Sequence, residues 1–227
     1  MARTMDPVAH RERREAFVEA AALLIQQKGY EAFSLGDVID SVGASKGALY
    51  HYFDSKAALL DATVERMVEG ALAALDTYVT DPDLSAAGKL EAIFAGLAQW
   101  KAERKDLLLA VMQVWYSDEN TVVREHLRRA TSTRLTPVLL GVVAQGVDEG
   151  VFRVRSVAGT AEVLVALVLG ANEKASRLWL ARQAGEVSFD EVESILAAFG
   201  EAFERVLDLP SGSLTLVSTD TLHQWYG

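Results

Sequence analysis

The stretch that decides the fold is Ser34–Lys56, with the sequence SLGDVIDSVGASKGALYHYFDSK. Ser34 and Asp37 stand three residues apart, the spacing of a capping box, which predicts a short helix that begins directly after Ser34. Gly43 ends this helix, and Ser45 caps a second short helix. Two short helices joined by a three-residue turn that contains glycine are typical of a helix-turn-helix.

Apolar residues in both short helices recur three and four positions apart, so each helix has one side that packs inward. The inward residues are Val38, Ile39 and Val42 in the first helix and Leu49, Tyr52 and Phe53 in the second. The opposite side of the second helix carries Lys46, Gly47, Tyr50 and His51. An ammonium group, a bare backbone, a phenol hydroxyl and an imidazole can all approach DNA closely. The spacing alone also fits a plain packing of three helices whose exposed side is polar without binding DNA.

Three residues that flank this side, Ser34, Ser45 and Lys56, have the chemistry of phosphate contacts. Hydroxyl caps and unpaired N–H groups at helix starts bind anions, and lysine supplies a positive charge. Gly47 needs a reason of its own, because glycine inside a helix costs about 1 kcal/mol relative to alanine. Close approach of a phosphate or a base would account for it.

The run Gly43–Phe53, GASKGALYHYF, followed by DSKAALL up to Leu60, resembles the signature of the tetracycline-repressor-like (TetR) family of bacterial regulators. The resemblance covers about residues 10–60. It implies phosphate contacts by Ser34, Tyr50 and Lys56, and contacts at or near base edges by Ser45, Lys46, Gly47 and His51. Ile39 stands where the family has a small alanine, which changes helix packing. Ala48 stands where the family has threonine, which removes a hydroxyl that could contact DNA.

The rest of the chain also has helical periodicity, because only four prolines interrupt its 227 residues. We expect an all-α fold of about nine helices. A helix-turn-helix domain with a short basic N-terminal arm is expected over residues 1–55, a ligand-binding and dimerisation domain over 56–208, and a tail without helical period over 209–227. A single long helix is expected over 55–80, and the helix over 156–182 is apolar enough to be buried on all sides.

The two last long helices expose more apolar surface than one small domain covers, which favours a homodimer. The candidate interface residues are Leu164, Leu167, Val192, Ile195, Phe199 and Phe203. In the resembling family these helices pair across a two-fold axis. Two recognition helices then meet successive major grooves about 34 Å apart, which implies a near-palindromic operator in double-stranded DNA. Both helices could instead close the core of a monomer.

Aromatic, methionine and amide side chains in the second domain could line a pocket for an unknown small-molecule effector. The candidates are Trp100, Met112, Trp115, Tyr116, Asn172 and Trp179. Each could equally be an ordinary core residue. Asn172 stands in an apolar stretch, where a buried amide must find a partner. The acidic surroundings favour a neutral or cationic apolar effector that releases the DNA by misplacing the recognition helices, with the helix 55–80 as the lever.

Composition limits the other function classes. The net charge of −10 counts against nucleic acid, but residues 1–60 hold seven Lys or Arg against eight Asp or Glu, so nearly all the excess acid lies further along. The absence of cysteine excludes disulfides and thiolate sites and fits the cytoplasm. No apolar run is long enough to span a membrane. Nucleotide-binding, hydrolase and metalloprotease motifs are absent, so we expect no enzyme, catalytic residue, metal or cofactor. The alternative function is a helical interaction protein without sequence-specific DNA binding.

Overall fold

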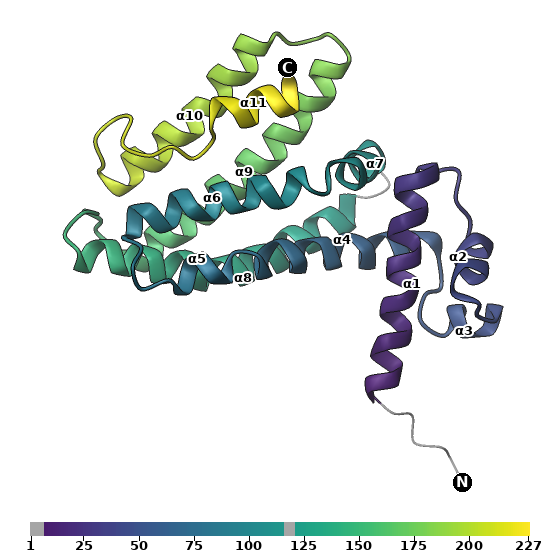
Figure 1. Cartoon of the computed structure of the whole chain (residues 1–227). Helices are drawn as coiled ribbons and strands as arrows, with labels where there is room; N and C mark the ends of the chain where they lie inside the picture. Colours follow the sequence, from purple (N-terminus) through teal and green to yellow (C-terminus); the bar gives the residue numbers. More distant parts are fainter. Residues whose placement is uncertain (1–6, 116–120) are drawn as a thin grey trace. The chain divides into compact units, whose positions relative to one another are not determined.

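The computed structural model describes residues 7–115 and 121–227, and within these ranges it contains helices and no strands (Figure 1). The all-α prediction is confirmed. The helices are α1 (Pro7–Lys28), α2 (Leu35–Val42), α3 (Lys46–Tyr50), α4 (Lys56–Ala73), α5 (Asp76–Thr80), α6 (Ala86–Ala102), α7 (Lys105–Trp115), α8 (Thr121–Asp148), α9 (Val157–Gln183), α10 (Phe189–Leu207) and α11 (Thr219–Tyr226). These eleven exceed the expected nine because the helix over 55–80 is divided and the tail contains a helix.

The chain forms two compact units. The first comprises residues 1–70 and 104–124, and the second comprises residues 71–103 and 125–227. These units do not coincide with the domain boundaries expected after residues 55 and 208. The expected boundaries separate functions rather than packing units, and they stay a prediction.

The first unit is built around α1. Phe17, Val18, Ala21 and Ile25 recur at helical spacing and are fully buried. Burying one such Phe, Val or Ile side chain contributes about 1.5–3 kcal/mol to folding. α1 ends at Gly29, whose φ of 78° lies in the left-handed region.

The start of α2 is held by the predicted capping box. The Ser34 hydroxyl accepts the N–H of Asp37 at 3.2 Å, and the Asp37 carboxylate accepts the N–H of Ser34 at 2.7 Å. Lys28 extends the motif, because its ammonium lies 2.9 Å from the other oxygen of Asp37. The hydrogen bond from Lys28, followed by those from Ser34, lowers the pKa of Asp37 to about 2.

The second unit has a core to which α6, α8, α9 and α10 all contribute. Leu90, Leu139, Leu164 and Phe203 are fully buried there. The ring of Phe203 meets that of Phe94 edge to face, at 5.4 Å between centroids. The sequence predicts that α9 is buried on all sides. In the structure only one side of α9 packs inward, so this prediction is wrong for the single chain.

The helix expected over 55–80 is interrupted at residues 74 and 75. Leu75 is buried in the core, and its N–H donates to the carbonyl of Leu72, so the backbone tightens for one turn. α5 then packs on α6, where the ring of Tyr78 lies against Gly96. A Cβ atom at Gly96 would lie 2.2 Å from this ring, so glycine is required for the approach. The tertiary contact of Leu75 thus overrides the helical periodicity.

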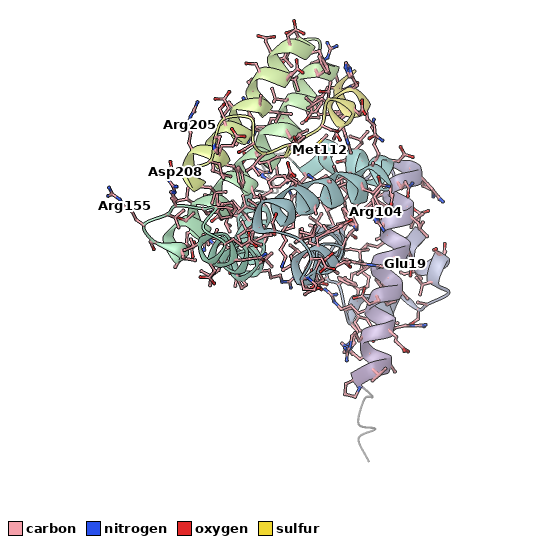
Figure 2. All side chains as sticks on the ribbon, turned by 60° about the vertical axis from the view of Figure 1, so that its left-hand side comes forward. Glu19, Arg104, Met112, Arg155, Arg205 and Asp208 are labelled. Carbon is pink, nitrogen blue, oxygen red and sulfur yellow. The ribbon has the colours of Figure 1, made fainter. Side chains whose placement is uncertain are left out.

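The segment after α10 is ordered, which the sequence left open, and it contains a helix, which the sequence does not predict. Asp208 ends α10 in the left-handed conformation, and Figure 2 shows its side chain and that of Arg205 projecting from this end of α10. We call residues 209–227 the strap. Its Leu214 and Leu216 are buried in the core of the second unit, and α11 packs on α9 and α10 (Figure 1).

A buried carboxylate fixes the turn that begins the strap. Glu204 of α10 accepts the N–H groups of Gly212 at 3.0 Å and of Leu214 at 2.9 Å. The bond from Leu214 is the largest cause that lowers the pKa of Glu204. The resulting stability is present above the ordinary value of 4.5 and is lost as the pH falls through the lowered pKa.

We expect Glu204→Leu to lower the free energy of unfolding by about 2–4 kcal/mol, because it leaves two backbone donors unsatisfied. Urea unfolding at neutral pH measures the loss. The control is Glu201→Leu, which removes an exposed carboxylate one turn earlier, paired only with Arg205 in the described structure. Equal stability of the two variants would contradict the role given to Glu204.

We also expect the pKa of Asp37, about 2 in the folded chain, to rise toward its ordinary value of 3.8 in the variant Lys28→Met. The Lys28 hydrogen bond is the largest cause of the lowered pKa. NMR titration of the Asp37 carboxyl carbon measures both values. An unchanged pKa in the variant would show that the backbone and hydroxyl of Ser34 suffice.

Candidate nucleic-acid interface

The turn between α2 and α3 has the geometry that the glycine predicts. Gly43 has a φ of 63° and a ψ of 39°, in the left-handed region, and its N–H donates to the carbonyl of Asp40. The N–H of Ala44 then donates to the carbonyl of Ile39 at 3.0 Å. Ser45 starts α3 by accepting the N–H of Ala48 at 3.2 Å. The helix-turn-helix of the sequence analysis is therefore present.

One side of α3 is anchored in the core of the first unit. Leu49 and Val38 have no exposed surface, and Phe53 is 4% exposed. The other predicted inward residues, Ile39 and Tyr52 among them, are half-buried. A five-residue helix is too short to be stable by itself, so the burial of Leu49 holds α3 in place.

The opposite side of α3 faces solvent. The candidates Lys46, Gly47, Tyr50 and His51 are all exposed, as are the caps Ser34 and Ser45. The ring of Tyr50 is 46% exposed, and the ammonium of Lys46 lies 5.7 Å from its centroid. The structure thus brings the candidates of α3 together on one accessible surface.

Gly47 adjoins open space. A Cβ atom placed on Gly47 would meet no atom within 4 Å, and its φ lies outside the left-handed region. Neither packing nor backbone geometry within the described structure therefore requires glycine. Close approach of another molecule to this backbone would account for the glycine.

Lys56 lies in a setting that its spacing in the sequence does not reveal. Its ammonium lies 4.4 Å from the ring of Tyr30 and 4.7 Å from that of Phe33, and it donates to the carbonyl of Glu31 at 3.2 Å. These contacts hold Lys56 beside the loop that leads into Ser34. The two predicted phosphate contacts therefore belong to one part of the surface.

The hydroxyl of Ser34 is already engaged, because it donates to Asp37 at 2.8 Å. A phosphate at this position would have to draw the hydroxyl proton away from that carboxylate. Lys28 reduces the cost by neutralising the charge of Asp37.

His10 is a member of the surface that sequence reasoning missed. Its ring lies 4.6 Å from that of Tyr52 and 5.7 Å from that of His51, measured between centroids. Arg11 and Arg13 follow it on α1 and are exposed. The first turns of α1 thus meet the end of α3. Forty residues separate His10 from His51, and no local pattern signals the contact.

The predicted pocket residues are divided between the two units. Met112, labelled in Figure 2, and Trp115 belong to the first unit and are half-buried. Trp100, Asn172 and Trp179 belong to the second unit, and Tyr116 lies outside the described residues. Their role as one pocket stays a prediction.

Asn172 is exposed, so the expectation of a buried amide is wrong. The apolar run ends before it, and the next residues of α9, Glu173 and Lys174, face solvent as well. Its partner is Lys101, whose ammonium donates to the Asn172 amide oxygen at 2.5 Å. Desolvation lowers the pKa of Lys101 to about 8. Trp179 instead packs in a small core where α9, α10 and α11 meet.

The predicted dimer residues also separate into two groups. Leu164, Val192 and Phe203 are fully buried within the chain, so no partner is needed to explain their burial. Leu167, Ile195 and Phe199 are half-buried and retain surface for a partner. Val163 of α9 is 47% exposed, although the sequence analysis places it on a buried helix.

Neither a metal site nor a membrane span emerges from the described ranges. They contain no group of three or more His, Asp or Glu side chains placed to hold a metal ion. None of their helices combines the length and the apolar character needed to cross a bilayer.

The sequence pattern described as "Bacterial regulatory proteins, tetR family" matches residues 17–63. The chain is 26% identical over 151 residues to the HTH-type transcriptional repressor KstR2 of Rhodococcus jostii, covering 62% of this chain and 68% of that protein. It is 29% identical over 102 residues to the Transposon Tn10 TetC protein of Escherichia coli, where the match spans 44% of this chain and half of TetC.

Solved structures extend the similarity beyond the helix-turn-helix. A TetR/AcrR transcriptional regulator of Thermobifida fusca has a TM-score of 0.57 at 26% identity, covering 83% of this chain and 96% of that one. A TetR regulator of Haloarcula marismortui has a TM-score of 0.61 at 21% identity, covering 87% and 97%, and shows the shared fold. With the capped helix-turn-helix and its exposed polar side, these similarities show that the chain is a transcriptional regulator and belongs to the tetR family of bacterial regulatory proteins.

Proposed function

We propose that the chain is a cytoplasmic, one-component repressor that binds a near-palindromic operator as a homodimer and is released by a small apolar effector. The observation that carries the proposal is the two-sided character of α3. One side is fixed by the buried Leu49, and the other presents Lys46, Gly47 and Tyr50 to solvent. Rigid presentation of a polar helix side is what a major groove requires.

Each contact has a distinct task in this proposal. Tyr50, Ser34 and Lys56 hold phosphates and set the position of α3 on the duplex. Ser45, Lys46 and His51 reach base edges, and Gly47 allows the close approach. His10 supports His51 from behind through the ring contact.

Dimerisation is proposed through α9 and α10. Leu167, Ile195 and Phe199 retain exposed surface there, and the exposed Val163 adds to the apolar area of α9. Phe199 lies next to Gly170, 3.8 Å from where a Cβ atom would stand, so the surfaces of α9 and α10 are continuous. A two-fold dimer would carry two copies of α3, one for each half of a near-palindromic operator.

Repression and release follow from the same scheme. The relative KstR2 is named as a repressor, which supports repression here. An effector releases DNA only if it binds more tightly to the conformation with misplaced recognition helices. α4 is the proposed lever, because it starts next to the helix-turn-helix and continues into the second unit. An enzymatic role is not proposed.

The proposal predicts tight and salt-sensitive binding to the DNA that flanks the chain's own coding sequence. Log–log plots of affinity against salt should have a slope of about −0.9 for each phosphate contact. Lys46→Ala and Tyr50→Ala should each weaken binding by about 1–3 kcal/mol, which is a factor of about 5 to 160. Fluorescence anisotropy with labelled fragments measures both effects.

Lys174→Ala is the matched control, because it removes an exposed lysine from α9 in the second unit. It should leave affinity and slope unchanged. Apolar association that resists salt, from a folded dimer without sequence preference, would instead support the helical interaction protein.

Gly47→Ala should separate folding from binding. The methyl group meets open space, so the gain in helix propensity should raise the free energy of unfolding by up to about 1 kcal/mol. Operator affinity should fall, because the methyl group occupies the space that the DNA backbone needs. Urea unfolding and anisotropy on one preparation measure the two effects. A variant that is stabilised and still binds at wild-type affinity would refute the role of Gly47.

A further inference from the structure

The second unit contains a groove of about 510 Å³ between α6 and the strap. Its volume lies within the range of small-molecule sites, about 300–1,000 Å³. None of the predicted pocket residues lines it. We propose that this groove binds an organic cation, an amine with an apolar body, and that Glu91 is its counter-ion. The inference deepens the proposed function and rests on its ligand response, because it names the place and the charge of an effector.

The floor of the groove is apolar and open. Ala92, Ala95, Ala98 and Ala102 recur three and four residues apart on one side of α6 and line it. Short side chains leave room above the helix that longer ones would fill. An aliphatic or aromatic body placed there would cover four methyl groups, each worth about 25 cal/mol for every Å² removed from water.

The wall opposite α6 belongs to the strap and is polar. Thr215, Ser218, Thr221 and Gln224 line it together with Leu216, and the hydroxyls of Ser218 and Thr221 share a hydrogen bond at 2.9 Å. Such groups can accept hydrogen bonds from an ammonium or donate them to a ligand oxygen. They orient a ligand without contributing charge.

Glu91 decides the charge of the ligand. One of its oxygens accepts the N–H of Thr215 at 2.8 Å, and its other oxygen has no hydrogen-bond partner within the ranges described. The residues that line the groove include no Lys or Arg. Lys101 lies on α6 too, but it does not line the groove, and it donates to Asn172 of α9. A half-buried carboxylate with a spare oxygen favours a cation and repels an anionic ligand.

The surroundings reinforce this preference. The second unit holds eleven Lys or Arg against eighteen Asp or Glu. Glu103 accepts a hydrogen bond from Gln99, which lines the groove. An excess of acid raises the local concentration of cations and slows the approach of anions.

A ligand on Glu91 would also act on the strap. The carboxylate that holds the ammonium is the one that anchors Thr215, and the adjacent Leu214 and Leu216 are buried in the core. An ammonium on the free oxygen fixes the carboxylate and with it the backbone of the strap. The amide of Thr215 should therefore exchange its hydrogen more slowly when the groove is occupied.

The test compares three probes with the same carbon skeleton and different charge, namely phenylpropylamine, phenylpropanol and phenylpropanoate. Titration of the full chain by ligand-observed NMR should show that the amine binds roughly threefold or more tightly than the alcohol, and that the carboxylate binds most weakly. Glu91→Gln keeps an acceptor for Thr215 and should remove the preference for the amine. Ala95→Phe fills the groove from an exposed position and should abolish binding of all three.

Glu186→Gln is the matched control, because it removes an exposed carboxylate from the turn between α9 and α10. It should leave the preference intact, and the amine should slow the exchange of the Thr215 amide in this variant as in the wild type. Equal binding of the three probes, or an amine preference that survives Glu91→Gln, would overturn the proposal. Operator binding is measured separately, so a chain that binds DNA but not the amine refutes this site alone, and failure of operator binding refutes the proposed function.

Discussion

The burial of Leu49 is the constraint on which the function of this chain depends. α3 spans only Lys46–Tyr50, and a helix of one or two turns has too few internal hydrogen bonds to persist alone. It persists because Leu49 and Val38 lose all contact with water inside the core built by α1. Burial of one leucine contributes about 1.5–3 kcal/mol to folding. The polar side of α3 can therefore be chosen for binding, since it does not have to hold the helix.

Because the buried side alone holds α3 in place, its exposed side can carry residues that do not favour folding. Gly47 lowers the helix propensity of α3 without easing any packing, and Lys46 and Tyr50 expose their side chains. Each choice is unfavourable or neutral for the isolated chain, and under the proposed function each serves the contact with DNA phosphates or bases. Residues 1–60 hold seven Lys or Arg against eight Asp or Glu, so nearly all the excess acid of the chain lies outside the helix-turn-helix.

Local interactions were predictable from the sequence, and distant ones were not. The capping box of Ser34 with Asp37 forms as predicted, because both partners lie within three residues of each other. The contact of His10 with His51 and the hydrogen bonds of Glu204 with the strap depend on tertiary packing, and no spacing reveals them. The prediction that Asn172 is buried fails for a related reason, since an apolar neighbourhood in the sequence does not say which side of α9 is covered. The exposed side of α3 was correctly predicted because helical periodicity and the family resemblance agreed there.

The core of the second unit accounts for the burial of Leu164 and Phe203. The strap packs on this core, and the sequence did not reveal that contact. Glu204 and Glu91 hold the strap through backbone N–H groups of neighbouring residues, so two carboxylates position one segment. The strap is held as well by Leu214 and Leu216, which are buried in the core. A ligand on Glu91 would act on this segment by fixing the carboxylate that anchors Thr215.

The central claim is that two copies of α3 read DNA from one face. Hydroxyl-radical footprinting of the DNA that flanks the coding sequence tests it most directly. The account predicts two protected patches on one face of the duplex, about 34 Å or one helical turn apart, within related half-sites. A folded dimer that protects no sequence, or that protects the duplex uniformly, would contradict it.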